Sequence, residues 1–459
     1  MMLSHIREFK SKMFGSVDVA ILVYFRIIFG SIMLWEVIRY FGNDWISAYW
    51  IEPAYNFTFY GFDWVKPLPG DGMYFLFVAL VILSIFMIIG FKYRIAATLF
   101  FFGFAYVFLL EQTNFLNHFY MIALVSFLLI FVPAHRTLSI DSWLNKKQHS
   151  DYAPYWSLWI LKFQIAIVYF FGGIQKISWD WLHGEPLRSW LSQNTHFPIL
   201  GSFFTEEWMV YSFSYGSMIL DLVAIPLLIW KKTRLLVFGI LIVFHLINSQ
   251  LFSIGIFPWF MILAALIFFD PSWPRFNKWT KSSSNPIPKI KSSFTKNQKV
   301  IFALIMIFII FQTTMPLRQY FYPGDPNWTE EGHNFSWTMK LRDKQTTSFR
   351  IDAFDPSTGK SWVVNPLYDL SVRQIWALSQ DPDSMVQYAH FIEDRLKEQG
   401  ISEDVEIRME SLVSLNGRES ELLIDPNIDL TKQEPTLLPK SWIIPYTNEL
   451  RVINNIDIP

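Results

Sequence analysis

The stretch FFGGIQKISWDW, residues 170–181, closes a long apolar run with a lysine that lies between glycines and tryptophans. The run starts near residue 155, so it has the roughly 20 residues that an α-helix needs to cross the hydrocarbon core of a bilayer. A charged side chain in such a segment is costly and usually faces a bundle interior or a cavity. The stretch therefore predicts a membrane helix that carries an amine, Lys176, to its outer end.

The composition of the whole chain also indicates a membrane protein. Of its 459 residues, 52% are hydrophobic and only 17% are charged, whereas soluble domains average about 25% charged. The net charge of -1 gives no indication of nucleic-acid binding. The absence of cysteine excludes disulfides, thiolate nucleophiles and thiolate metal sites.

About nine apolar segments approach the length of a membrane span. They cover residues 19–41, 73–91, 95–111, 118–134, 155–175, 207–230, 234–252, 256–270 and 299–316. Two of them, 118–134 and 256–270, are short enough to be tilted or re-entrant. An odd number of crossings places the two termini on opposite sides of the membrane.

The charges in the loops predict the orientation. The basic loops lie within residues 7–12, 92–94, 136–147, 231–234 and 275–296. They carry seventeen Lys and Arg residues, whereas the short loops on the other side carry three. By the positive-inside rule, this asymmetry places the N-terminus in the cytoplasm and the C-terminal part outside it, in a periplasm or lumen.

The chain becomes polar after Pro316, which predicts a transmembrane domain, residues 1–316, and an extracytoplasmic domain, residues 317–459. Apolar and polar residues alternate in RIDAF (350–354) and VEIRMESLV (405–413), as in half-buried strands. Residues 381–400 have the pattern of one amphipathic helix that ends at a glycine. We predict a polytopic α-helical membrane protein with a β-rich α+β domain at its C-terminus.

The position of Lys176 allows two interpretations. Its long stem could bring the ammonium to the headgroups, or it could occupy a poorly hydrated pocket where desolvation favours the neutral amine, which is a base. Gly172 and Gly173 would let a ligand or a neighbouring helix approach the backbone closely. Trp179 and Trp181 are either interfacial anchors or the wall of an aromatic pocket.

Other polar residues stand in apolar surroundings near the end of the seventh segment. His245, Asn248 and Ser249 are spaced i, i+3 and i+4, so they share one helix face. They either make hydrogen bonds between helices or line a ligand cavity.

The fourth segment carries polar residues at both ends: Asn117 and His118 open it, and His135 and Arg136 close it. A His–Arg pair at a helix end is most often an anchor at the membrane interface.

Two charged residues lie inside apolar segments. Arg26, in the first segment, needs an internal partner, and Asp221 in the sixth is the obvious candidate for a structural pair. The nine histidines are scattered, with no HExxH motif, so we expect no metal site. The motifs GxSxG and GxGxxG do not occur either.

Several longer strings closely resemble the vitamin K-dependent γ-glutamyl carboxylase family. They are FLNHFYMIALVSFLL (115–129), SFLLIFVPAHRTLSIDSW (126–143), FFGGIQKISWDW, FHLINSQLFSIG (244–255), DPSWPRF (270–276), NWTEEGHNFSWTMKLRD (327–343) and LLIDPNIDL (422–430). The resemblance covers roughly residues 20 to 445 in order. The short loops and the lack of cysteine make the chain more similar to a bacterial than to an animal member.

The resemblance implies an integral membrane enzyme of the carbon–carbon lyase class, with a catalytic transmembrane domain and an outer domain that binds the substrate. Such enzymes oxidise a reduced naphthoquinone, vitamin K hydroquinone or menaquinol, with O₂ to its 2,3-epoxide. They couple this oxidation to γ-carboxylation of a peptidyl glutamate with CO₂. The implied cofactors are reduced vitamin K, O₂ and CO₂, without a metal. The implied partners are the lipid membrane and a glutamate-containing peptide or protein.

The resemblance also implies roles for particular residues. Lys176 matches the lysine that deprotonates the hydroquinone. A γ-C–H bond is too weakly acidic for any side chain, so oxygenation of the quinol must supply a stronger base in a cavity that excludes water. The residues expected to position the quinone or the glutamate are His245, Asn248, Asn117, His118, His135 and Arg136. Trp179 and Trp181 are expected to pack the ring or its isoprenoid chain, and Trp337 to lie where the peptide enters.

The chain departs from the animal enzymes at three points. Ala134–His135–Arg136 stands where they have adjacent Asn and His, which bears on the glutamate half of the reaction. Gln175–Lys176 stands where they have two lysines. No disulfide can join the two domains, so their contact must be non-covalent. Two alternatives follow: a quinol epoxidase without efficient carboxylation, or a non-catalytic membrane protein that binds a quinone or lipid, such as a transporter.

Overall fold

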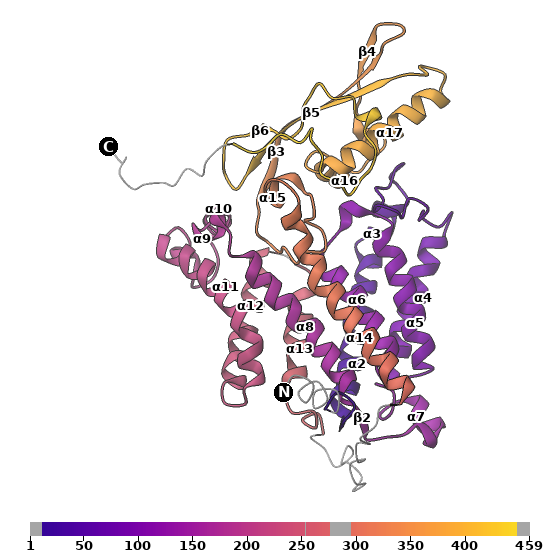
Figure 1. Cartoon of the computed structure of the whole chain (residues 1–459), viewed down its shortest axis with the longest axis vertical. Coiled ribbons are helices and arrows are strands. Elements are labelled where there is room, and N and C mark those ends of the chain that lie inside the picture. The colour runs from indigo at the N-terminus through magenta and orange to yellow at the C-terminus, as the bar shows by residue number, and fades with distance from the viewer. Residues whose placement is uncertain (1–11, 253, 276–294, 448–459) are drawn as a thin grey trace.

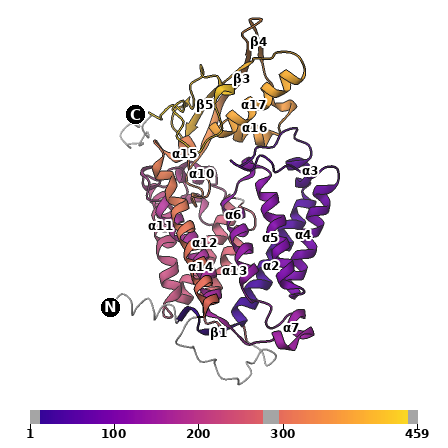
Figure 2. The same ribbon diagram turned by 45° about the vertical axis from the view of Figure 1, so that its right-hand side comes forward.

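The computed structural model describes residues 12–252, 254–275 and 295–447, and it has two layers (Figure 1). Long helices form the lower layer of the view, and strands with short helices form a smaller outer layer above them (Figure 2). The basic loops 92–94, 136–147 and 231–234 lie at the end of the helices away from the outer layer. The basic loops and the outer layer are therefore at opposite ends, as the predicted orientation requires.

All nine predicted segments are helical in the described part of the chain. The helices are α2 (Ala20–Gly42), α4 (Gly72–Ile89), α5 (Tyr93–Leu109), α6 (Asn117–Phe131), α8 (Tyr155–Gln175), α11 (Glu207–Ile229), α12 (Arg234–Phe252), α13 (Phe257–Ala265) and α14 (Lys296–Thr314). Among the described residues, six helices are long and apolar enough to cross a membrane, whereas α5, α6 and α13 are shorter. These helices identify an integral membrane protein, and the number of crossings stays a prediction.

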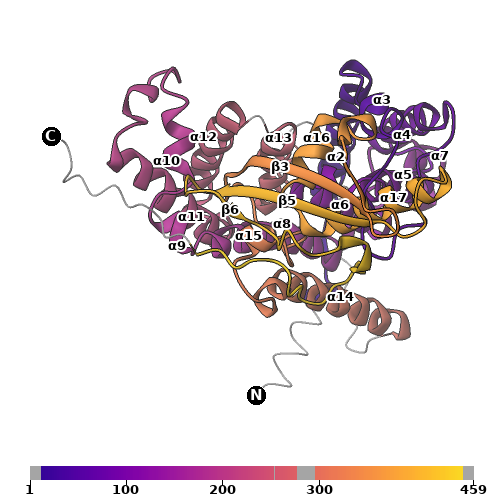
Figure 3. The ribbon, with the colours of Figure 1, turned by 90° about the horizontal axis from the view of Figure 1, so that it is seen from above.

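The helices differ in how much of their surface is buried. Most of α2 and α8 is buried inside the bundle, whereas α12 and α14 leave most of their apolar surface exposed, as lipid-facing helices do. Seen from above, α11 and α12 lie on one side of α8, and α4 and α5 lie on the other (Figure 3). Helix α8 therefore connects the two halves of the helical layer, and its outer end carries Lys176.

Short elements close the ends of the helical layer. At the inner end, strand β1 (Ser16–Asp18) pairs antiparallel with β2 (Tyr152–Pro154), next to helix α7 (Ile140–Leu144). At the outer end lie α3 (Trp45–Trp50), α9 (Trp179–Leu182), α10 (Leu187–Ser192) and α15 (Pro326–Thr329). These elements turn the chain between spans without adding further long helices.

The outer layer is built on a four-stranded sheet with the order β4-β3-β5-β6. The strands are β3 (Lys344–Asp355), β4 (Lys360–Val363), β5 (Glu406–Leu415) and β6 (Glu421–Leu422), and all neighbours are antiparallel. Helices α16 (Val372–Leu378) and α17 (Pro382–Glu398) pack against the sheet around a second apolar core. The predicted strands around 350 and 410 and the predicted helix 381–400 are confirmed.

Besides the chain that continues from α14 to β3, non-covalent contacts join the two layers. Phe57, from the segment between α3 and α4, is fully buried in the core of the outer layer. The backbone of Ala54 donates to the carbonyl oxygen of Asp369 at 2.8 Å, and Gln374 donates to the Glu111 carboxylate at 2.9 Å. A loop of the helical part is thus incorporated into the outer layer, which the sequence pattern did not predict.

Arg26 is fully buried in α2 and has backbone partners in place of the predicted acid. Its guanidinium donates to the carbonyl oxygens of Leu138 (2.6 Å), Ala134 (2.9 Å) and Ile88 (3.3 Å). These carbonyls end or follow α4 and α6, where helix carbonyl groups lack partners and attract a cation. The predicted Arg26–Asp221 pair is wrong, and Asp221 has another partner.

Candidate functional site

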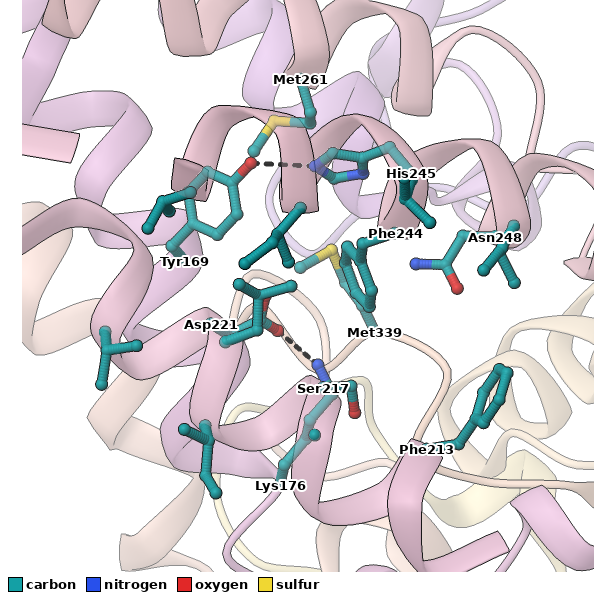
Figure 4. Close-up of a pocket in the computed structure, with 18 of the residues that line it drawn as sticks. Tyr169, Lys176, Phe213, Ser217, Asp221, Phe244, His245, Asn248, Met261 and Met339 are labelled. Carbon is teal, nitrogen blue, oxygen red and sulfur yellow. Dashed lines mark hydrogen bonds and ion pairs between the residues drawn. The ribbon is translucent and has the colours of Figure 1, made fainter. Parts of the chain in front are cut away.

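A cavity of about 950 Å³ lies beside the outer end of α8. Side chains of α8, α11, α12 and α13 line it, together with Met339 from the segment that leads to β3 (Figure 4). Lys340 of the same segment also lines it. Its wall is mostly apolar, and a few polar groups converge on it, which is the usual composition of a site for a small organic ligand.

Lys176 follows the last residue of α8 and is only 7% exposed. Its Nζ forms an ion pair with the Asp221 carboxylate on α11 (Figure 4). The same atom lies 5.5 Å from the ring centroid of Trp181. In the part of the chain that the structure describes, Asp221 is the one hydrogen-bond acceptor of this amine. The predicted apolar surroundings of Lys176 are present, with a carboxylate that the prediction assigned to Arg26.

Two glycines bring α8 close to its neighbours at this point. A Cβ on Gly173 would lie 2.7 Å from Cγ of Leu222, so glycine allows α11 to pack against α8. A Cβ on Gly172 would lie 3.5 Å from Oδ2 of Asp221 and 3.3 Å from Cε of Met339. The glycines therefore place the carboxylate within reach of the amine one turn further along α8.

His245 and Asn248 line the same cavity from α12, as predicted. His245 is 3% exposed, and its Nε2 lies 2.9 Å from the hydroxyl oxygen of Tyr169. Tyr169 is on α8, seven residues before Lys176, so the two side chains lie on one helix face. The hydrogen bond to Tyr169 fixes the imidazole ring at the cavity wall, while Asn248 points into the space near Phe244 (Figure 4).

The side of the cavity formed by α11 and α12 faces outward from the bundle. Leu236 and Val243 line the cavity and are 68% and 58% exposed. The lining residues of α12 run from Leu235 to Phe252, which is a length of about 25 Å at the rise of an α-helix. The cavity is therefore long, apolar and open on the side where lipid surrounds the helices.

The segment 335–340, called the roof here, reaches the cavity through Met339 and Lys340. Ser336 accepts a hydrogen bond from Gln175 at 3.2 Å through its carbonyl oxygen. Phe335, Trp337 and Lys340 have φ values of 65°, 60° and 52°. Residues other than glycine rarely adopt this left-handed backbone conformation. Such strain persists only where the surroundings determine it, and it often accompanies a functional site.

Asn117 and His118 lie one layer behind the cavity wall. The side-chain amide of Asn117 donates to the carbonyl oxygen of Thr338 at 2.8 Å, so it holds the roof in place. The ring centroid of His118 lies 5.8 Å from that of Phe257, which lines the cavity. Both residues support the site, but neither lines it.

His135 and Arg136 lie at the inner end of the helices, away from Lys176. His135 stacks on Tyr93 with ring centroids 5.3 Å apart, and Arg136 donates to the carbonyl oxygen of Tyr152 at 2.6 Å. Burial is the largest cause that lowers the pKa of His135, to about 4, so its ring is neutral at pH 7. The expectation that these two residues share the site of Lys176 is not met, because α6 runs from the outer to the inner end.

The predicted tryptophans differ in position. Trp181 lines the cavity, but Trp179 is 67% exposed, and its ring centroid lies 3.9 Å from that of His183. Trp337 is fully buried and stacks on Tyr120 with centroids 4.9 Å apart. Trp179 is thus no pocket residue, and Trp337 is buried within the roof segment without offering an open surface to a peptide.

Sequence reasoning missed three residues of the site. Asp221 is the single acid deep within α11, and this signal was present but led to the wrong partner. Tyr169 could have been found by its spacing of two helical turns from Lys176. Lys340 gives no signal in the sequence, because it follows a loop that only tertiary contacts bring to the cavity.

The fold and the cavity define an integral membrane protein with a ligand-sized chamber at the junction of its helical and outer layers. The sequence matches the HTTM domain over residues 14–273, which is more than half of the chain, and the lumenal domain of vitamin K-dependent gamma-carboxylase over residues 297–449. The chain belongs to the vitamin K-dependent gamma-carboxylase family. No solved structure matches it. The second match begins within α14, so the lumenal-domain family includes the last long helix.

Proposed function

We propose that this protein oxidises a reduced naphthoquinone with O₂ to its 2,3-epoxide and uses that reaction to carboxylate the γ-carbon of a peptidyl glutamate. The observation that carries the proposal is the buried Lys176 amine, whose one hydrogen-bond acceptor among the described residues is Asp221 and which faces a long apolar cavity. Membership of the family supports the same carboxylase-like chemistry.

The residues of the cavity fit a flat aromatic diol with a long apolar chain. Lys176, His245 and Asn248 would contact the hydroxyl groups, and the apolar side chains along α11 and α12 would hold the isoprenoid chain. Reduced vitamin K or menaquinol, when bound, supplies on reaction with O₂ a base stronger than any side chain. The open side of the cavity would let such a lipid-soluble molecule enter from the bilayer.

Lys176 and Asp221 would take up the hydroxyl proton of the diol. Their ion pair is neutral as a whole, which lowers the cost of burying it. For Lys176 to act as the base, the proton that the pair shares would have to lie on the Asp221 carboxylate, which leaves the amine neutral. When that neutral amine accepted the hydroxyl proton of the diol, the pair would gain one positive charge beside the oxygen that lost the proton, and the low-dielectric surroundings would strengthen their attraction.

Lys340 would receive the glutamate carboxylate. Its Nζ lies over the rings of Trp190 and Phe252, 5.7 and 5.6 Å from their centroids, at the end of α12 nearest the outer layer. Within the described residues no carboxylate oxygen lies within 4.0 Å of this amine. The cavity thus has two amines and one acid, which favours an anionic substrate, and the outer layer would hold the peptide on the extracytoplasmic side.

The alternatives are a quinol epoxidase without efficient carboxylation and a non-catalytic quinone- or lipid-binding protein. The departure at His135–Arg136 favoured the first, but these residues lie at the other end of the helices from Lys176. The buried charged pair argues against a purely passive lipid site, because an apolar wall would bind lipid at lower cost.

The test uses the purified protein in lipid nanodiscs with reduced menaquinone, O₂, labelled CO₂ and a glutamate peptide. We expect both the 2,3-epoxide and label in the peptide. Epoxide without label would leave the epoxidase alternative, and binding of the quinone without either product would leave the non-catalytic one.

A further inference from the structure

A charged contact joins the outer layer to the helical layer close to Lys176. Arg418 donates from both Nη atoms to the carboxylate of Asp180, at 2.5 and 2.6 Å, and Asn416 donates to the same carboxylate at 2.6 Å. The side chains of Arg418 and Asp180 are only 9% and 14% exposed. A guanidinium that binds a carboxylate through two parallel hydrogen bonds fixes both its position and its angle.

The outer layer presents these donors from a tight turn. Asn416 and Gly417 begin the connection from β5 to β6, residues 416–420, and both have positive φ values, 53° and 76°, as the two central residues of a tight Asn-Gly turn do. The backbone of Arg418 closes this turn by donating to the carbonyl oxygen of Leu415 at 3.2 Å. The backbone of Asp343 donates to the side-chain oxygen of Asn416 at 2.8 Å. The turn is therefore held to the start of β3, and its two donors point to one place on the helical layer.

On the helical side, the contact is one residue away from the wall of the cavity. Asp180 precedes Trp181 in α9, and the indole nitrogen of Trp181 donates to the carbonyl oxygen of Ser214 on α11 at 2.9 Å. The same indole ring lies 5.5 Å from Nζ of Lys176. A helix of four residues is not stable alone, so α9 keeps its place through such contacts.

We propose that Arg418 is a positioning residue for Lys176. The outer layer holds α9 through the Asp180 carboxylate, and α9 holds the Trp181 ring against the amine. The inference rests on the proposed function only in giving Lys176 the role of the base. It provides a physical route by which a peptide on the outer layer acts on the amine in the cavity, because a shift of the β5–β6 turn moves α9.

The first test reads the amine directly and needs no enzymatic activity. Acetic anhydride is applied to the folded protein in nanodiscs, and mass spectrometry gives the rate of modification at Lys176, with buried Lys344 as internal reference. We expect Arg418→Gln to raise the rate at Lys176 about tenfold, as loss of one strong contact would, and to leave Lys344 unchanged. The modification rate at Lys176 in Arg418→Lys should lie between the rates in wild type and in Arg418→Gln. The matched control is Arg350→Gln, which breaks an exposed ion pair on β3.

The modification rate at Lys176 in Asp180→Asn should equal that in Arg418→Gln. The double variant should show no larger rate, because both changes remove the same contact between Arg418 and Asp180. An unchanged rate at Lys176 in Arg418→Gln would overturn the inference. An equal rise at Lys344 would overturn it too, since the variant would then loosen the whole outer layer.

The second test separates positioning from stability. We expect Arg418→Gln to lower kcat for epoxide formation about tenfold with little change in KM for the quinol, and Arg418→Lys to recover part of it. If the wild-type protein forms no epoxide, the proposed function fails, whereas the modification rates still decide the role of Arg418.

Discussion

Lys176 in the helical layer and Lys344 in the outer layer are alike in three respects. Both are buried, with 7% and 4% of their surface exposed. Both form an ion pair with a carboxylate. Each places Nζ near an indole ring, 5.5 Å from the centroid of Trp181 and 5.7 Å from that of Trp328. They differ in what surrounds the rest of the amine.

All three donors of the Lys344 ammonium are hydrogen-bonded. It donates to the carbonyl oxygens of Trp328 (2.6 Å) and Gln380 (2.7 Å) and to the Glu330 carboxylate (2.9 Å). An ammonium has three donors, so all are used. Lys176 has one acceptor within the described chain, and it also lines the cavity. An amine whose donors are all hydrogen-bonded holds a structure together. An amine with free donors beside a cavity can exchange a proton with a molecule that enters the cavity.

The largest expected effect comes from replacing Lys176. Lys176→Met should lower the rate of epoxide formation about 10³-fold, because a positioned base contributes roughly that much, while quinone binding persists. The measurement is epoxide yield per enzyme at saturating quinol. The double variant Lys176→Met/Asp221→Leu is the control, since it leaves no unpaired buried acid and should be equally inactive. Activity within tenfold of wild type would remove Lys176 from the mechanism.

Replacing Lys344 should have the opposite consequence, a loss of stability with little loss of activity. Lys344→Met should destabilise the protein by about 3 kcal/mol, because it removes one of the two cations that pair with the buried Glu330 carboxylate and leaves two carbonyls without a donor. Thermal unfolding in nanodiscs measures this loss, and kcat of the molecules that remain folded should change little. If Lys344→Met lost kcat and kept its stability, the distinction between the two amines would be wrong.

The ion pair of Lys344 should also give a pH dependence. Burial alone raises the pKa of Glu330, but Arg342 and Lys344 outweigh it and lower that pKa from 4.5 to about 2. A carboxyl group whose pKa is lower in the folded state stabilises the fold above its unfolded pKa and loses this contribution as the pH falls. We expect Glu330→Gln to be less stable than wild type by about 2 kcal/mol at pH 7. The difference should shrink between pH 4.5 and 2 in thermal unfolding, and a difference independent of pH would contradict the ion pair.

The smallest expected effect concerns the space beside Lys176. A Cβ on Gly239 of α12 would meet no heavy atom within 4 Å, and the residue lines the cavity. Gly239→Leu should therefore fill part of the cavity and raise KM for the quinol about tenfold, the equivalent of about 1.4 kcal/mol. Gly42→Leu is the matched control, because Gly42 also has open space around it but lies outside the cavity. Equal KM values in both variants would place the ligand elsewhere.

The predictions that succeeded depend on local patterns. Apolar runs fixed the nine helices, and alternation fixed β3 and β5, because burial against lipid or a sheet face leaves a direct trace in the sequence. Those that failed concern residues that share no element. The ends of α6 appeared equivalent, yet Asn117 supports the roof of the cavity and His135 lies at the inner end.

The pairing of charges shows the same limit. The sequence predicted an internal partner for Arg26 alone, and Asp221 was assigned to it. The structure gives Arg26 three backbone carbonyls and gives Asp221 to Lys176. Backbone carbonyls at helix ends have no signature in the sequence, so counting charged side chains alone could not find them.

The sequence by itself determined a membrane protein with a β-rich α+β domain at its C-terminus, its family, and the amine most worth attention, since lipid solvent restricts which residues a span can carry. Only the tertiary structure decided that Asp221 pairs with that amine and that Lys340 lines the same cavity. It also decided that Arg418 of the outer layer binds Asp180 of α9 beside the cavity. The physical reason is that ion pairs and cavities form between elements distant in the chain, where packing geometry rather than periodicity selects the partners.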